Sequence, residues 1–127
     1  MKIYGIGTDL SNINRIKKNL KNKNFINRIF NKSEIKKCNQ LTNKANCYAK
    51  RFAAKEAFSK AIGTGISNGI NFKEIIVYNT KSGRPAIRLL GNTKKIANKI
   101  MNKKKFNIFL SLSDDKPFAV ATVVISI

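Results

Sequence analysis

One segment of this 127-residue chain, RFAAKEAFSKAIG at 51–63, constrains the fold more than any other. Its apolar residues recur with the spacing of an α-helix that buries one face. They are Ala54, Ala57, Phe58, Ala61 and Ile62. The pattern predicts a long helix from about Asn46 to Ile62, closed by Gly63 as a C-terminal cap. A helix with such a face has to pack on a neighbouring layer of structure.

Strand patterns flank this helix on both sides in the sequence. Residues 2–9 predict a short strand in which two glycines allow another backbone to come close, and which ends at Asp9. Residues 72–78 and 86–90 predict a hairpin around the turn KSGRP. The segments FNIFLSLS and FAVATVVISI, joined by DDKP, predict a closing hairpin that is apolar on both faces over part of its length.

Further helices fill the remaining segments. Ser11 is the predicted N-cap of a first helix whose apolar spacing continues to Phe30, and Ser33 begins a second. A last helix begins at Asn92 or Thr93. The predicted order is strand, three helices, hairpin, helix, hairpin. It indicates the α+β class, with an antiparallel sheet packed with helices in one domain spanning residues 1–127.

The composition limits the chemistry. The chain has no histidine, which excludes Ser-His and Cys-His nucleophile pairs and the usual Cys/His zinc site. Catalysis then requires carboxylates, lysine, tyrosine or a hard metal such as Mg²⁺, which prefers oxygen ligands. The net charge of +20 predicts attraction to polyanions, although part of the lysine content fits the bias of an AT-rich genome.

The two cysteines and the N-terminus indicate a compartment. Cys38 and Cys47 lie in a polar region without a secretory context, so we expect reduced thiols. The opening MKIYGIGTDL lacks the apolar region of a signal peptide, and no apolar run has membrane-spanning length. These features predict a cytoplasmic protein that does not bind a membrane.

Glu56 and Lys60 project away from the apolar face of the long helix. Periodicity alone favours a solvated pair one turn apart, worth about 0.3 to 0.5 kcal/mol. The alternative is that this polar face carries function.

Five motifs carry a resemblance to a known family. They are GIGTDL at 5–10, INRI at 13–16, RFAAKEAFSKAIGTGI at 51–66, GRP at 83–85 and SLSDDKPFAVATVVI at 111–125. In order and spacing they resemble the holo-acyl carrier protein synthase family, the small bacterial 4'-phosphopantetheinyl transferases of fatty acid biosynthesis. The resemblance implies transfer of the 4'-phosphopantetheine arm of coenzyme A (CoA) to a serine of apo-acyl carrier protein, with Mg²⁺ as cofactor.

The same resemblance implies roles for individual residues. Asp9 and Glu56 match the family's Mg²⁺ ligands, and Lys60 matches its active-site lysine. Glu56 or a metal-bound water would take the proton of the serine hydroxyl. The expected CoA contacts are Arg51, Lys55, Ser59, Lys60, Gly63, Thr64 and Gly65.

Carrier proteins of this kind are acidic, so basic residues of the first helix are the expected docking residues. Arg15 matches a family arginine, whereas Lys18 and Lys21 follow from charge alone. The family resemblance implies a homotrimer with active sites between subunits. The apolar closing hairpin would supply either the contact between subunits or part of the core of each chain. The chain departs from the family pattern at two positions: many members carry an acidic residue at the position of Asn12 and a histidine at the position of Asp114.

Two other functions compete with the transferase hypothesis. A small basic RNA-binding protein would explain the charge, but the sequence has no aromatic RNA-binding motif, zinc knuckle or GXXG clamp, so we expect no nucleic acid partner. An inactive paralogue would bind CoA or carrier protein without transfer. The presence of Asp9, Glu56 and Lys60 argues against it.

Overall fold

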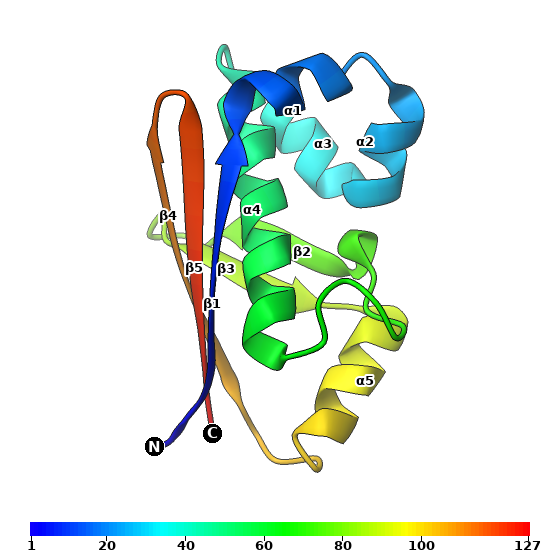
Figure 1. The fold of residues 1–127 in the computed structure, drawn as a ribbon, viewed down its shortest axis with the longest axis vertical. Coiled ribbons are helices and arrows are strands. Elements are labelled where there is room, and N and C mark those ends of the chain that lie inside the picture. Colours follow the sequence, from blue (N-terminus) through cyan, green and yellow to red (C-terminus); the bar gives the residue numbers. More distant parts are fainter.

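The computed structural model of the protein describes residues 1–127 and is built on a three-stranded antiparallel sheet. The strands are β1 (Ile3–Asn12), β4 (Asn107–Asp115) and β5 (Phe118–Ser126), with β5 in the centre. The backbones of Lys2 and Ile127 exchange two hydrogen bonds of 2.8 Å. The two ends of the chain therefore lie side by side at one end of this sheet (Figure 1).

Helix α4 (Lys44–Ile62) packs along one face of the sheet (Figure 1). Alternate residues of β5, from Ala119 to Ile125, are buried on that face, together with the predicted apolar stripe of α4. The helix ends at Gly63, whose φ of 95° lies in the left-handed region that glycine adopts readily. The predicted long helix and its cap are confirmed.

Two glycines of β1 let the strand lie directly on the backbone of α4. A Cβ on Gly5 would overlap the carbonyl oxygen of Ala61, and one on Gly7 would overlap that of Ala57. The alanines of α4 leave the helix backbone open to this approach. The predicted close approach at these glycines is confirmed, and it sets the distance between β1 and α4.

Three short helices cover the first half of α4. They are α1 (Ile13–Asn19), α2 (Lys23–Ile29) and α3 (Lys32–Asn39), and asparagines at 12, 22 and 31 cap their N-termini through side-chain oxygens. Together with α4 they enclose a second apolar cluster that includes Phe30 and Tyr48, whose rings pack edge to face.

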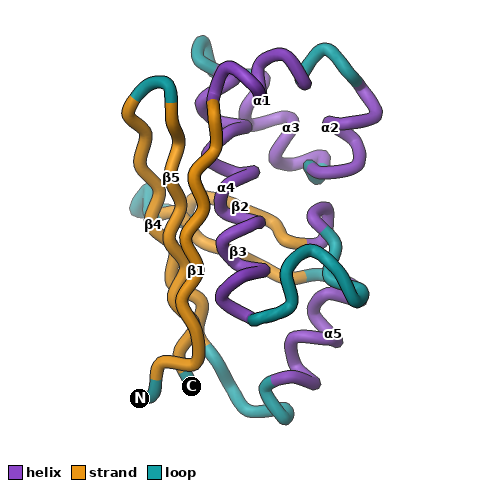
Figure 2. Tube along the Cα trace, viewed as in Figure 1, coloured by secondary structure: helices purple, strands orange, loops and turns teal.

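A two-stranded sheet passes behind α4 in the view of Figure 2, and its second strand contacts β4 of the first sheet. It consists of β2 (Ile75–Asn79) and β3 (Pro85–Leu89), follows the 3-10 turn η1 (Phe72–Glu74), and leads into α5 (Gly91–Ile100). The Glu74 carboxylate accepts hydrogen bonds from the backbone N–H groups of Asn92 and Thr93 and so caps α5. Because layers lie on several sides of α4, 13 of its 19 residues are buried.

The α+β class with antiparallel sheets is confirmed, but several details of the prediction are wrong. β1 continues to Asn12, so Asp9 lies within the strand, opposite Ala121, and does not end it. Asn12 replaces Ser11 as the first N-cap. The first predicted helix is split in two because Asn22 caps a new helix, and four helices precede the first hairpin.

The expectation of free thiols is also wrong for this structure. Cys38 of α3 and Cys47 of α4 form a disulfide, and both residues are buried. The four-residue connection between α3 and α4 turns the chain back on itself and brings the two positions face to face. Among the helices, none combines the length and apolar character needed to cross a membrane.

Candidate active site

Asp9 and Lys60 meet where β1 packs along α4. Asp9 lies on the same face of β1 as Gly5 and Gly7, because side chains alternate along a strand. The ammonium of Lys60 donates to Asp9 Oδ1 at 3.1 Å and to the carbonyl oxygen of Thr8 at 3.0 Å. The Asp9 side chain is 17% exposed. A lysine charge is therefore fixed beside a partly buried carboxylate at the surface.

Glu56 lies one turn before Lys60 but makes no ion pair with it. Desolvation is the main cause that raises the pKa of Glu56; the Asp9 carboxylate raises it further, while Lys60 lowers it. The solvated Glu56–Lys60 pair expected from periodicity is wrong, because Lys60 reaches across to β1. Two carboxylates close enough to repel each other share this corner of the molecule.

The donor set of this corner fits a hard divalent cation. Asp9 and Glu56 supply carboxylate oxygens, and a cation between them would relieve the repulsion that raises the pKa of Glu56. No cluster of three or more acidic, histidine or cysteine side chains occurs in the structure. An ion held by these two carboxylates would keep coordination positions for water and phosphate oxygens, as Mg²⁺ commonly does.

Arg51 lines a cavity of about 420 Å³ in a different region of α4. It is only 6% exposed, yet its Nε has no partner. Its Nη1 donates to the disulfide sulfur of Cys47 at 3.1 Å, and its Nη2 donates to Asn79 Oδ1 at 3.4 Å. Desolvation lowers the pKa of Arg51, and Glu34 partly offsets this. A buried guanidinium with weak internal partners is suited to receive an anion.

Lys55 does not lie at a ligand surface, and its prediction as a CoA contact is wrong. Its side chain is fully buried, and its ammonium donates to Glu34 Oε1 at 2.7 Å and to three carbonyl oxygens at 2.7 to 2.9 Å. Burial lowers the pKa of Lys55 to about 8 against the opposing effect of Glu34. The group holds the structure together and has no free donor.

Ser59 is not placed to contact a ligand through its side chain, and the glycine loop at 63–65 does not present free backbone N–H groups. Ser59 is fully buried, and its hydroxyl donates to the carbonyl oxygen of Glu56 at 2.7 Å. The backbone N–H groups of Gly63, Thr64 and Gly65 all donate to the carbonyl oxygen of Ser59. These nitrogens end the helix, so they are not available to cradle a phosphate.

The predicted docking residues Arg15, Lys18 and Lys21 are exposed around α1. Lys21 lines a cavity of about 480 Å³ between α1, the start of α4 and the β4–β5 turn, and Arg15 and Lys18 lie outside it. The helix thus presents positive charge in more than one direction.

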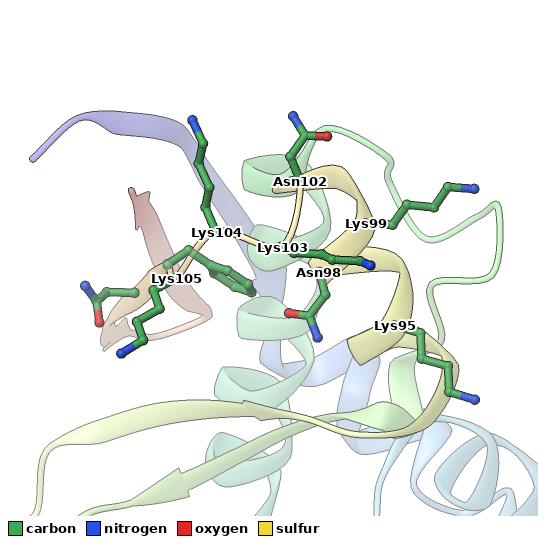
Figure 3. A pocket seen from close by; sticks show the side chains of 9 residues that line it. Lys95, Asn98, Lys99, Asn102, Lys103, Lys104 and Lys105 are labelled. Atoms are coloured by element: carbon green, nitrogen blue, oxygen red, sulfur yellow. The ribbon is translucent and has the colours of Figure 1, made fainter.

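A wide hollow beside α5 is lined mainly by lysines and asparagines. Its volume is about 1140 Å³, and its lysines extend outward around it (Figure 3). They are Lys95, Lys99, Lys103, Lys104 and Lys105. Phe106 is the single apolar residue of the lining, and no carboxylate or nucleophile contributes. The hollow can attract polyanions but contains no group that resembles a reaction centre.

Sequence reasoning missed a second polar network. The Asp114 carboxylate contacts Asn46 and Lys50 of α4. The i, i+4 spacing of Asn46 and Lys50 was a signal that they share a face, but their partner lies more than sixty residues away in the chain. Asn79, the partner of Arg51, was also missed, and nothing in its local sequence identifies it.

Comparisons with known proteins identify the family of this chain. A family model described as the 4'-phosphopantetheinyl transferase superfamily matches residues 5–123. The holo-[acyl-carrier-protein] synthase of Pelagibacter ubique is 52% identical over 125 residues, which cover 98% of each chain.

Two crystal structures are similar over nearly their full length. The holo-[acyl-carrier-protein] synthase of Neisseria meningitidis has a TM-score of 0.88 at 35% identity, with 99% of this chain and 100% of that chain covered. The enzyme of Bacillus anthracis, in complex with CoA (3',5'-ADP), has a TM-score of 0.80 at 37% identity, with 97% and 96% covered.

Proposed function

Because the chain belongs to the 4'-phosphopantetheinyl transferase superfamily, we propose that it is a holo-acyl carrier protein synthase. It transfers 4'-phosphopantetheine from CoA to a serine of apo-acyl carrier protein and releases adenosine 3',5'-bisphosphate. The observation that carries this proposal is the meeting of Asp9, Glu56 and Lys60 at the junction of β1 and α4. The CoA complex of the related Bacillus anthracis enzyme supports the choice of donor.

The residues of this junction have distinct tasks. Asp9 and Glu56 hold Mg²⁺, which when bound neutralises charge on the pyrophosphate of CoA. Lys60 is fixed by Asp9 and Thr8 and can donate to an oxygen of the leaving phosphate. The serine oxygen forms the new bond to phosphorus as the bond to the nucleotide phosphate breaks.

The serine also has to lose its proton. Asp9 already accepts from Lys60, whereas Glu56 has no hydrogen-bond partner for its carboxylate. The pKa of Glu56 is raised and its carboxylate is free to accept, so it is the residue of this chain that we assign to the proton.

The proposed oligomer is a homotrimer with shared active sites. Arg51 and Glu56 are five residues apart on α4, which places them about 140° apart around the helix. The anion cavity and the carboxylate pair of one chain therefore face different directions, which supports a site completed by a neighbouring subunit. The partner is the acidic carrier protein, with Arg15, Lys18 and Lys21 as docking residues. The compartment is the cytoplasm.

The outer face of the three-stranded sheet is the proposed trimer contact. Ile6, Leu10 and Phe109 are 63%, 59% and 49% exposed there. Ile6 and Phe109 pair with the same residue of β5, so their side chains form a continuous apolar strip. We expect Ile6→Glu to convert the trimer to monomer and to reduce transfer, as measured by light scattering after size exclusion and by the transfer assay. A wild-type monomer, or a trimeric variant, would contradict this assignment.

Intact-mass spectrometry of apo-acyl carrier protein tests the function. Incubation with CoA, Mg²⁺ and the enzyme should add the mass of one phosphopantetheine group to the carrier, and an excess of EDTA should prevent it. A folded enzyme that leaves the carrier unmodified would refute the proposal. Modification that persists in EDTA would refute the metal role alone.

A further inference from the structure

Asp114 joins the end of β4 to the start of α4. Its Oδ2 accepts a hydrogen bond from Asn46 Nδ2 at 3.0 Å, and its Oδ1 lies 3.1 Å from the Lys50 ammonium. Asn46 and Lys50 are one helical turn apart, so one carboxylate holds both at once. An isolated surface ion pair between side chains that are 30% exposed would contribute little to stability. The additional hydrogen bond from Asn46 means that the carboxylate holds two side chains of α4 in position.

The two residues held by Asp114 line the cavity of Arg51, while Asp114 itself does not. Lys37, Lys50 and Arg51 supply positive charge to this cavity, and no acidic residue lines it. Within it, the Arg51 Nε has no partner although the residue is buried. Asp114 therefore pairs with two residues that line a cationic cavity, while its own carboxylate lies outside the lining.

We propose that Asp114 is a positioning residue for anion recognition: it holds Lys50 and Asn46 at the Arg51 cavity so that Lys50 meets a phosphate group of the nucleotide. This inference rests on the proposed function, since CoA supplies the phosphate. A lysine that is held in place before binding loses less conformational freedom when the anion arrives.

Two substitutions separate position from charge. Asp114→Ala removes both contacts. Asp114→Asn keeps the shape and can keep both hydrogen bonds, because the Asn46 amide, whose Oδ1 has no partner, can turn over to accept one. Asp115→Ala is the matched control, because Asp115 is an exposed neighbour that makes no ion pair or side-chain hydrogen bond.

We expect Asp114→Ala to raise the KM for CoA about 10-fold, as loss of one charge-assisted contact would, with kcat retained. Asp114→Asn and Asp115→Ala should stay within about 2-fold of the wild type on the same scale. Lys50→Met should reproduce the rise, and the Asp114→Ala/Lys50→Met double variant should show no further increase, because the two residues act as one unit.

An unchanged KM in Asp114→Ala, an equal rise in Asp114→Asn, or additive effects of Asp114 and Lys50 would each overturn the proposal. Calorimetric titration with adenosine 3',5'-bisphosphate provides a readout that does not need transfer. If the wild type modifies no carrier protein, the proposed function fails. The titration still shows whether Asp114→Ala weakens anion binding about 10-fold, as the inference requires.

Discussion

Glu56→Gln is expected to reduce phosphopantetheine transfer by about 100- to 1,000-fold, the cost of removing one charged group from a reaction centre of this kind. The amide keeps the size of the side chain but can neither take up the serine proton nor supply an anionic ligand to Mg²⁺. The rate of carrier modification, followed by intact mass, measures the loss. Asp115→Asn makes the same chemical change at an exposed site and should retain wild-type rates.

The same substitution should not weaken the fold. The folded-state pKa of Glu56 is raised, so the protonated form is the one that folding favours. Stability contributed by this group is present at low pH and is lost as the pH rises through the folded pKa. At neutral pH the neutral amide should therefore give an equal or slightly higher melting temperature than glutamate. A variant that is both inactive and clearly less stable would contradict this assignment.

The pH dependence of transfer should also reflect the raised pKa of Glu56. Glu56 acts as a carboxylate, so activity should fall as the pH is lowered through its pKa. At subsaturating Mg²⁺, where Glu56 titrates without the cation, desolvation and Asp9 raise that pKa, so the acidic limb should lie above the pH expected for an ordinary glutamate. The limb should be absent from the residual activity of Glu56→Gln. Its persistence there would assign it to another group.

Lys55→Met is expected to destabilise the protein by about 3 to 5 kcal/mol, the usual cost of leaving one partner of a buried ion pair alone. The substitution leaves the Glu34 carboxylate, which is 1% exposed, without its ammonium partner, and it removes the donor of three carbonyl groups that are buried or partly buried. Those acceptors come from α2, η1 and β2, so the ammonium ties several elements to α4. Urea denaturation followed by circular dichroism measures the change.

Glu34→Gln serves as the matched variant for this pair. Its amide oxygen can still accept from Lys55, so we expect a smaller loss than for Lys55→Met. The result also tests the CoA contact that the motif suggested for Lys55. A stable Lys55→Met variant with a raised KM for CoA would restore that contact and contradict the structural role.

Local patterns predicted the elements that depend on local chemistry. The apolar period of α4, its glycine cap and both hairpins follow from spacing and turn residues, and all are present. The C-terminal end of β1 could not be predicted from local sequence. Asp9 is held within the strand by pairing with β5, which comes from the other end of the chain. The split between α1 and α2 depends on one asparagine cap that sequence reasoning passed over.

The candidate site was predictable in part, but from the family motif and not from local patterns. Periodicity alone favoured a solvated Glu56–Lys60 pair, and only the family motif joined Glu56 to Asp9. The motif could not show which of its polar residues face inward. Lys55 is buried because α3, η1 and β2 cover a second side of α4, and Ser59, one turn further along the helix, is also buried. That burial is a property of the assembled layers, which one helix does not reveal.

The contact between β1 and α4 has a consequence for how the catalytic corner tolerates change. Its spacing is set by two main chains in contact at Gly5 and Gly7, with no side chain between them that has rotamers to adjust. Substitutions elsewhere in the core can therefore lower the melting temperature without changing the separation of Asp9 and Glu56. In evolution or in engineering, the reaction geometry of such an enzyme can be inherited intact while its stability drifts.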